Sequence, residues 1–253
     1  MDLGLRDRVY VVSGGSSGLG YASASALVSD GARVVVGSRR AGRVDSAVDR
    51  LGGARYAVGV PGDLAAPDTP TRLIEAARAS YGRLDGALIS VGGPPGGTAC
   101  EMTDERWRAG FESVFLGALR LARSVAAGLG AGGSIAFVLS TSVRQPIGGL
   151  AISNGLRPGL AMLAKTLADE LGPRGIRVNG LLPGSIETDR ICELEAGGAD
   201  PGAHRADREA AIPLRRYGRP EEFGAVAAFL LSPAASYLTG AMIPVDGGVL
   251  RGI

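Results

Sequence analysis

The chain has 253 residues, of which 45% are hydrophobic and 21% charged, and its formal net charge is +2. This length suits one large α/β domain with a well-buried core, and the glycines show no periodicity that would indicate a fibrous protein. The basic residues are scattered along the chain, so the sequence lacks the basic stripe that a nucleic-acid-binding protein needs.

Two cysteines and one histidine limit the metal and nucleophilic chemistry that the chain could perform. Cys100 and Cys192 lie far apart without a partner motif, which indicates a reducing compartment and no disulfide framework. A histidine-based site would rest on His204 alone, in a stretch typical of a loop, so we predict a solvated histidine and no metal site. The sequence shows no signal peptide and no apolar run long enough to span a bilayer, which predicts a cytoplasmic protein without a membrane segment.

Short apolar runs alternate with longer helical patterns from end to end. The runs are continuous, which is typical of parallel strands buried on both faces. We predict strands at 9–13, 33–37, 56–60, 85–90, 134–139, 176–181 and 242–245. We predict helices near 18–30, 41–51, 68–81, 104–129, 151–172 and 220–231. Repeated β-α-β units of this kind form an α/β fold with a doubly wound parallel sheet of about seven strands and helices on both faces.

No linker rich in Pro or Ser divides the chain, so residues 1–253 are predicted to form a single domain. The one long irregular stretch runs from about Gly184 to Pro220 and contains the run from Gly197 to Gly202. Because it follows the carboxyl end of a central strand, where ligands bind in such sheets, we predict a lid-like substrate loop at about 185–219. The alternative is a plain surface excursion.

A glycine-rich turn follows the first predicted strand directly. The glycines permit a close approach of backbone to phosphate, and the next helix points its free N–H groups and positive dipole end at the anion. The position between a first strand and a helix predicts a Rossmann-type dinucleotide-binding domain. The residues predicted to contact the cofactor here are Ser13, Gly14, Ser16, Ser17, Gly18, Leu19 and Gly20.

This turn resembles the Thr-Gly-x-x-x-Gly-x-Gly motif of the short-chain dehydrogenase/reductase family, with Ser13 keeping the hydroxyl of the Thr. The resemblance runs through nearly the whole chain and includes the segments 237–240 and 245–248. It implies hydride transfer between a nicotinamide dinucleotide and a small-molecule substrate. It also implies a homodimer or homotetramer, because the family's long helices, here near 104–129 and 151–172, pack against a symmetry mate.

The resemblance also implies cofactor contacts elsewhere in the chain. They are Asp63 and Leu64 at the adenine, Ser90 and Gly92 after the fourth strand, Pro183 and Gly184 in a Pro-Gly turn, and Ile186 and Thr188 at the nicotinamide amide and phosphates.

The end of the second strand bears on the choice between NADP(H) and NAD(H). A carboxylate there would accept a hydrogen bond from the adenosine 2′-hydroxyl and repel a 2′-phosphate. This chain has Ser38, Arg39 and Arg40 instead, and Arg39 can pair with a phosphate. The sequence therefore favours NADP(H) over NAD(H); the alternative is that both arginines are merely solvated, with Arg39 stacking on the adenine.

The family's catalytic tetrad of Asn, Ser, Tyr and Lys is altered in this chain. Counting along the helix that ends near 171 places Ser153 at the Tyr position, Arg157 at the Lys position and Ser140 at the Ser position. Counting from Trp107 places Val114 at the Asn position. Only Ser140 is unchanged, and we predict Ser140, Ser153 and Arg157 as the catalytic residues.

These substitutions change what the site can do. A phenol has a pKa near 10, whereas a serine hydroxyl is far less acidic and Ser153 reaches less far than a tyrosine. Arg157 keeps a positive charge and could bind the nicotinamide ribose, but it cannot shuttle a proton. The chain's one lysine, Lys165, lies roughly 12 Å further along the helix and is expected to be solvated. Ser142, Arg144 and Gln145 could serve either the substrate or ordinary turn chemistry.

Three functions are compatible with this sequence. The first is an NADP(H)-dependent oxidoreductase whose proton comes from Ser140, Ser153, water or the substrate. The second is a non-redox enzyme for cyclisation, elimination or isomerisation on the same fold. The third is a non-catalytic NADP(H)-binding module.

Overall fold

The computed structural model describes the backbone of residues 2–195 and 201–252, and the side chains of residues 2–192 and 205–252. Its seven strands are β1 (Val9–Ser13), β2 (Arg33–Ser38), β3 (Ala57–Pro61), β4 (Gly86–Ile89), β5 (Ser134–Val138), β6 (Arg177–Pro183) and β7 (Met242–Val245). They form one sheet in the order β3-β2-β1-β4-β5-β6-β7, and every described pairing is parallel. The predicted doubly wound sheet is confirmed.

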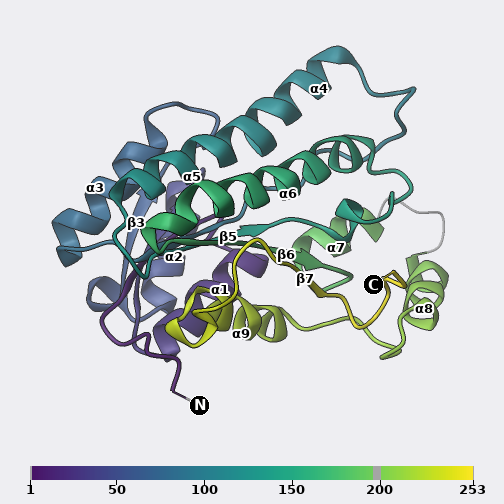
Figure 1. Ribbon diagram of the computed structural model, residues 1–253. Coiled ribbons are helices and arrows are strands. Elements are labelled where there is room, and N and C mark those ends of the chain that lie inside the picture. The colour runs from purple at the N-terminus through teal and green to yellow at the C-terminus, as the bar shows by residue number, and fades with distance from the viewer. Residues whose placement is uncertain (1, 196–200, 253) are drawn as a thin grey trace.

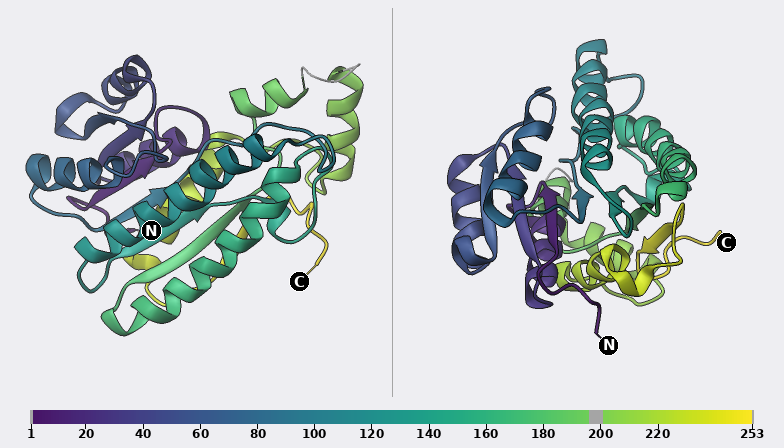
Figure 2. Two further views of the ribbon diagram at one scale, coloured as in Figure 1. Left: turned by 90° about the horizontal axis from the view of Figure 1, so that it is seen from above. Right: turned by 60° about the vertical axis from the view of Figure 1, so that its left-hand side comes forward.

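Helices cover both faces of the sheet (Figures 1 and 2). The α-helices are α1 (Gly18–Ser29), α2 (Ala41–Arg50), α3 (Thr69–Tyr81), α4 (Asp104–Gly110), α5 (Gly117–Gly128), α6 (Ala151–Leu171), α7 (Asp189–Glu195), α8 (Pro201–Ala211) and α9 (Pro220–Leu231). The shorter turns are η1 (Gly53–Arg55), η2 (Phe111–Leu116), η3 (Thr141–Val143), η4 (Gly172–Arg174) and η5 (Pro233–Ala235).

Two apolar cores lie on opposite faces of the sheet because successive strand residues point to opposite sides. In β1, Val9 and Val11 belong to the core under α3, α5 and α6, whereas Tyr10 and Val12 belong to the core under α1, α2 and α9. Burial on both faces explains why the strands are continuous apolar runs in the sequence.

The helix predicted at 104–129 is confirmed, and it consists of α4 and α5 joined by η2, a turn of π-helix that the regular apolar spacing did not indicate. The expectation of an irregular stretch from about 184 to 220 is wrong. The stretch predicted to be irregular carries α7 and α8. Glycine and proline around 197–202 concealed these short helices, since both residues are rare in helix interiors.

The two ends of the segment that carries α7 and α8 are tied together. Ile186 and Gly218 form a parallel β-bridge. The Glu187 amide donates to the Gly218 carbonyl at 2.9 Å, and the Gly218 amide donates to the Ser185 carbonyl at 3.0 Å. Arg205 of α8 also pairs with Glu187. The segment therefore leaves and rejoins the domain at one place, beyond the carboxyl ends of β5, β6 and β7 (Figure 1).

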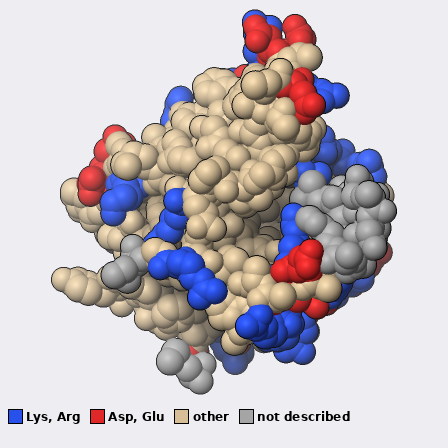
Figure 3. Space-filling model, turned by 90° about the vertical axis from the view of Figure 1, so that its right-hand side faces the viewer, with Lys and Arg blue, Asp and Glu red and all other residues tan. Residues whose placement is uncertain are grey.

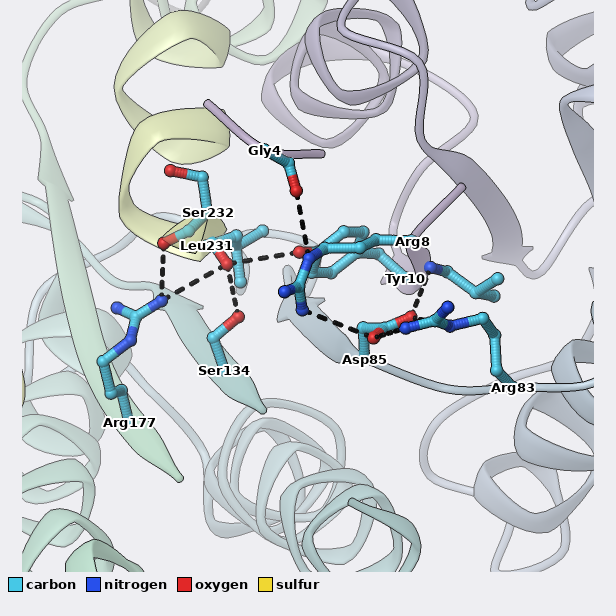
Figure 4. Close-up of polar contacts among 10 residues, drawn as sticks. Gly4, Arg8, Tyr10, Arg83, Asp85, Ser134, Arg177, Leu231 and Ser232 are labelled. Carbon is cyan, nitrogen blue, oxygen red and sulfur yellow. Dashed lines mark hydrogen bonds and ion pairs between the residues drawn. The ribbon is translucent and has the colours of Figure 1, made fainter. Parts of the chain in front are cut away.

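At the opposite end of the sheet, Arg177 of β6 holds the end of α9 (Figure 4). Its guanidinium donates to the carbonyl oxygens of Leu230, Leu231, Ser232 and Leu238 at 2.8 to 3.4 Å. Three of these carbonyls, those of Leu230, Leu231 and Ser232, lie at the negative end of the α9 dipole, which favours a cation. Burial lowers the pKa of Arg177, because it withdraws the charge from water. The carbonyl oxygens stabilise this charge in place of a carboxylate.

We expect Arg177→Ala to lower the free energy of unfolding by about 2 to 4 kcal/mol, because buried carbonyls would lose their donors. Urea unfolding followed by circular dichroism measures this change. Arg123→Ala, at an exposed position of α5, is the control and should stay within about 0.5 kcal/mol of the parent protein. Equal stability of the two variants would contradict this role of Arg177.

Candidate cofactor and substrate site

The order of the strands reverses between β1 and β4, and the Ser13 hydroxyl joins these two strands at their carboxyl ends. Ser13 Oγ donates to the Ser90 carbonyl at 2.8 Å and accepts from the Ser90 amide at 3.0 Å. Parallel α/β sheets bind their ligands at such a reversal. Two predicted cofactor residues therefore meet where a ligand is expected.

The glycines of the turn after β1 allow backbone atoms to approach where side chains would collide. A methyl group on Gly14 would lie 2.8 Å from the Ser90 carbonyl oxygen, and one on Gly20 would collide with the Gly14 carbonyl oxygen. Gly14 and Gly18 also have φ values of 59° and 53°, in the left-handed region that favours glycine. Close packing at Gly14 and Gly20 thus brings the start of α1 onto the end of β1.

The start of α1 offers backbone donors to an anion. Ser17 is the N-cap residue, its side chain makes no capping hydrogen bond, and the first turn, with Gly18, Leu19 and Gly20, contains no acidic residue. A methyl group on Gly18 would lie 3.6 Å from the Thr188 side chain, so the predicted nicotinamide-side residue Thr188 lies beside the turn. The arrangement fits a diphosphate group at the positive end of the helix.

The carboxyl end of β2 extends this site toward the predicted adenosine. Ser16 Oγ donates to Ser38 Oγ at 2.9 Å, which joins the glycine turn to β2. Arg39 and Arg40 are exposed, and neither guanidinium pairs with another described residue. Arg50 is held differently: its guanidinium donates to the Ser16 carbonyl at 3.3 Å and lies 4.0 Å above the Tyr21 ring.

The remaining predicted cofactor residues also follow the carboxyl ends of strands. Asp63 comes after β3 and is exposed, with one carboxylate oxygen accepting from the Ala65 amide at 3.0 Å. The Leu64 carbonyl lies so close to Gly117 that a methyl group there would come within 2.8 Å of it. Gly92 lies in the loop after β4, with open space around it.

The turn after β6 is equally close-packed. Pro183 ends β6, and Gly184 packs against the Asp246 backbone, where a methyl group would approach to 2.8 Å. Ile186 is buried, and Thr188 directly precedes α7. The structure thus brings the predicted cofactor residues of five strand ends, those of β1, β2, β3, β4 and β6, to one edge of the sheet.

The serines predicted to be catalytic lie where β5 meets α6. Ser142 Oγ lies 3.2 Å from Ser153 Oγ, and both residues are buried. Ser140 Oγ accepts from the Ser142 amide at 3.1 Å and so caps η3. The Ser140 hydroxyl therefore stabilises the turn after β5. Ser142, which the sequence offered as a further polar group near the substrate, contacts Ser153 directly.

Asn154, next to Ser153, orders the loop before α6. Its side-chain oxygen accepts from the Ile147 amide at 3.0 Å, and its side-chain nitrogen donates to the Ile147 carbonyl at 2.8 Å. Arg144 extends this support by donating to the Met242 and Gly252 carbonyls. Asn154 and Arg144 hold the backbone beside the site.

Arg157 lies one turn further along α6 than Ser153 and is only 6% exposed. Its Nη1 donates to the Val138 carbonyl at the end of β5, at 2.8 Å. Two effects lower the pKa of Arg157 to about 10: burial, which is the larger, and the positive charge of Arg190. The guanidinium consequently remains cationic at neutral pH.

Arg190 of α7 was not singled out by the sequence, because it reaches the site only through the fold. Its guanidinium donates to the Pro94 carbonyl at 2.6 Å and packs against Gly93. It therefore joins α7 to the loop after β4 and adds positive charge near Arg157.

Val114 and Lys165 make no polar contribution to this site. Val114 lies within η2 and is buried in the core beside α5 and α6. Lys165 is exposed, as predicted, and its Nζ donates to the Gly240 carbonyl at 3.2 Å. Residue 204 belongs to α8 rather than to a loop, and its side chain lies outside the described residues.

Figure 3 shows the end of the molecule where α7 and α8 lie; it is hollowed near the middle, with basic side chains on either side. The region between β5 and α6 supplies hydroxyl groups and one fixed cation but no phenol, through Ser140, Ser142, Ser153 and Arg157.

Within the described part of the chain, no three His, Cys, Asp or Glu side chains gather to hold a metal. Nor does any described helix have the length and apolar character needed to cross a membrane.

Comparisons with known proteins agree with this geometry. Residues 14–250 match the protein family described as enoyl-(acyl carrier protein) reductase. Dehydrogenase/reductase SDR family member 4 of Caenorhabditis elegans is 32% identical over 253 residues, which cover 96% of this chain and 95% of that protein.

Two solved structures resemble the whole chain. L-Sorbose reductase from Gluconobacter frateurii, complexed with NADPH and L-sorbose, has a TM-score of 0.92 and 31% identity, with full coverage of both chains. The apo form of a short-chain oxidoreductase from Pseudomonas aeruginosa, described as containing an atypical catalytic center, has a TM-score of 0.90 and 28% identity, also with full coverage.

The different surroundings of Gly20 and Gly42 predict opposite effects on stability when each is replaced by Ala. Gly20→Ala should lower the free energy of unfolding by about 1 to 3 kcal/mol, because the new methyl group collides with backbone that cannot move freely. Gly42→Ala, in α2 with open space around it, should stabilise the protein by about 0.5 kcal/mol. Urea unfolding of both variants measures the difference, and a neutral Gly20→Ala would disprove the close packing.

Proposed function

Since the chain belongs to the short-chain dehydrogenase/reductase family, we propose that it is an NADP(H)-dependent oxidoreductase that reduces a carbonyl, enone or imine substrate with an atypical active site. The proposal rests on a glycine turn and helix end that fit a dinucleotide, together with the sequence spacing that assigns Ser153 and Arg157 to the positions of the family's Tyr and Lys. The family and the fold are shared with oxidoreductases, whereas the residues beside the substrate are proposed to differ.

The cradle fits a dinucleotide. Gly14 and Gly20 leave no room for side chains, and the first turn of α1 has neither a side-chain cap nor an acid that would repel phosphate. We propose that the residues from Ser13 to Gly20 hold the diphosphate, Asp63 the adenine, and Ile186 and Thr188 the nicotinamide end. A nicotinamide cofactor, when bound, supplies or accepts the hydride.

The preference for NADP(H) rests on Arg39. Its exposed guanidinium follows β2, where a carboxylate would be expected for NAD(H), and no described side chain pairs with it in competition with a phosphate. The sorbose reductase that resembles this chain was solved with NADPH. Arg39, with Arg40 beside it, is therefore proposed to pair with the 2′-phosphate.

The proposed proton source differs from the family's tyrosine. Ser153 is buried and shares a hydrogen bond with Ser142, so its hydroxyl can hold a proton at the site but lacks the acidity of a phenol. The cationic Arg157 orients the nicotinamide ribose and stabilises negative charge that develops on the substrate oxygen. Such a site suits an acceptor that needs little acid assistance, such as an iminium, an activated enone or a quinone.

The relative with an atypical catalytic center indicates that the fold tolerates other residues at the site. The two alternative functions, non-redox chemistry and nucleotide binding without turnover, make different predictions. Product of unchanged oxidation state, formed without added nucleotide, would support the former. Tight NADPH binding without turnover on any substrate would support the latter.

We also propose that the chain forms a homodimer or homotetramer through α4, α5 and α6. Phe111 and Met162 are 42% and 66% exposed, and Phe111 stacks on Phe115 at 5.2 Å. A shallow apolar hollow of about 540 Å³ lies beside them, lined in part by Trp107 and Leu156. Exposed apolar surface of this kind is typical of an interface.

The segment 185–219 is proposed to close over the substrate as a lid.

Arg39→Ala should weaken NADPH binding by about tenfold or more and leave NADH binding within about twofold, because only NADPH loses a charge-assisted hydrogen bond. Isothermal titration calorimetry with both nucleotides measures the two affinities. Arg6→Ala, at an exposed position before β1, is the matched control and should change neither. A parent protein that binds NADH more tightly than NADPH would contradict the role of Arg39.

Ser153→Ala should slow NADPH oxidation by about 100-fold at unchanged nucleotide affinity if its hydroxyl delivers the proton. The assay follows NADPH consumption with a panel of carbonyl, enone and imine substrates. Ser46→Ala, at an exposed position of α2, serves as the control. Unchanged turnover in both Ser153→Ala and Ser140→Ala would remove these serines from the mechanism.

A further inference from the structure

Arg157 is a buried cation without a carboxylate beside it. The residue is 6% exposed, and its guanidinium has a single described hydrogen bond, to the Val138 carbonyl. None of the ion pairs among the described side chains includes it. A buried charge is costly unless it is paired, so such a residue is expected to act on a ligand.

The other buried arginine among the described residues, Arg177, is compensated. It spreads its charge over four carbonyl oxygens, those of Leu230, Leu231 and Ser232 at the end of α9 and that of Leu238. The charged group that acts on Arg157 is instead another cation, Arg190. The positive potential at the end of β5 is therefore a property of this site and not of buried arginines in general.

We propose that Arg157 determines which redox form of the cofactor binds: the site holds the reduced, uncharged nicotinamide ring more tightly than the oxidised, cationic ring. This inference rests on the proposed function, because it requires a nicotinamide dinucleotide at the carboxyl ends of the strands. In the proposed function Arg157 orients the nicotinamide ribose, so its charge lies near the ring, and like charges in a partly buried site repel strongly enough to weaken binding by about tenfold or more. The family's tyrosine, which could offset the charge as a phenolate, is replaced here by Ser153.

The inference has a consequence for the direction of the reaction. In the reduction, the acceptor gains a hydride from the cofactor and a proton from the site or solvent, and the ring is left oxidised with a positive charge. Arg157 therefore favours the bound state before hydride transfer and the release of the oxidised cofactor after it. Arg157 would stabilise an alkoxide or enolate formed on the acceptor, because that anion has the opposite charge. Both effects suit a reductase better than a dehydrogenase.

The test is the ratio of two equilibrium dissociation constants, Kd of NADP⁺ over Kd of NADPH, for the full chain without substrate. The two forms share the adenosine, the phosphates and both riboses, so the ratio isolates the charge of the ring. We expect about ten or more for the parent protein and for Arg157→Lys, which keeps the charge. Arg157→Gln should bring the ratio close to one, mainly by tightening the binding of NADP⁺, whereas Arg123→Gln should leave it unchanged.

A parent ratio near one, or an unchanged ratio in a folded Arg157→Gln variant, would overturn the inference. If Arg157→Gln does not fold, as judged by circular dichroism, the parent and Arg157→Lys still decide, because a ratio near one in either contradicts the proposal. The pair NADH and NAD⁺ gives the same ratio independently of Arg39. Failure of the parent protein to bind any of the four nucleotides would instead refute the proposed function and, with it, this inference.

Discussion

The reciprocal hydrogen bonds between Ser13 and Ser90 are the constraint on which the site depends. They join β1 and β4 at the place where the strand order reverses, so two connections leave the sheet in opposite directions from adjacent strand ends. The glycines that follow Ser13 then allow α1 to begin in contact with the end of β1. An anion-binding helix end, the loop after β4 and the turn after β6 all converge on this point, because the sheet is parallel and every strand ends at the same edge.

The substrate half of the proposed site is built from α6 and the end of β5, where Ser153 and Arg157 are proposed to replace the family's Tyr and Lys. Ser153 and Arg157 lie one helical turn apart, each buried and each tied to the β5 side, through Ser142 and Val138 respectively. A phenol beside a lysine can exchange its proton and thereby change the charge of the site. Hydroxyl groups beside a guanidinium keep the charge fixed, so electrostatics take over part of what acid–base chemistry does elsewhere in the family.

The sequence predicted the strands to within one or two residues, because burial on both faces leaves a continuous apolar run whose ends are polar or glycine. The glycine turn could also be predicted, since glycine best tolerates the close approaches at Gly14 and Gly20 and the positive φ at Gly14 and Gly18. Three features had no local signal. The π-turn η2 does not interrupt the apolar pattern, α7 and α8 are short helices beside glycine and proline, and Arg190 approaches Arg157 only through the tertiary fold. The spacing placed Ser140 correctly after β5 but could not show that its hydroxyl caps a turn while Ser142 contacts Ser153.

Because Ile186 and Gly218 form a bridge, the segment between them can change in sequence and length while the rest of the fold stays the same. The entropy lost in closing a loop grows only slowly with its length, and the bridge fixes the closing point whatever lies between. Insertions, deletions or exchanges within 189–217 are therefore expected to leave the sheet and the turn after β1 undisturbed while they remodel the segment proposed as a lid. In such an architecture, substrate range can diverge quickly between relatives whose sheets remain superimposable, and the segment is the natural unit to transplant when a new specificity is sought.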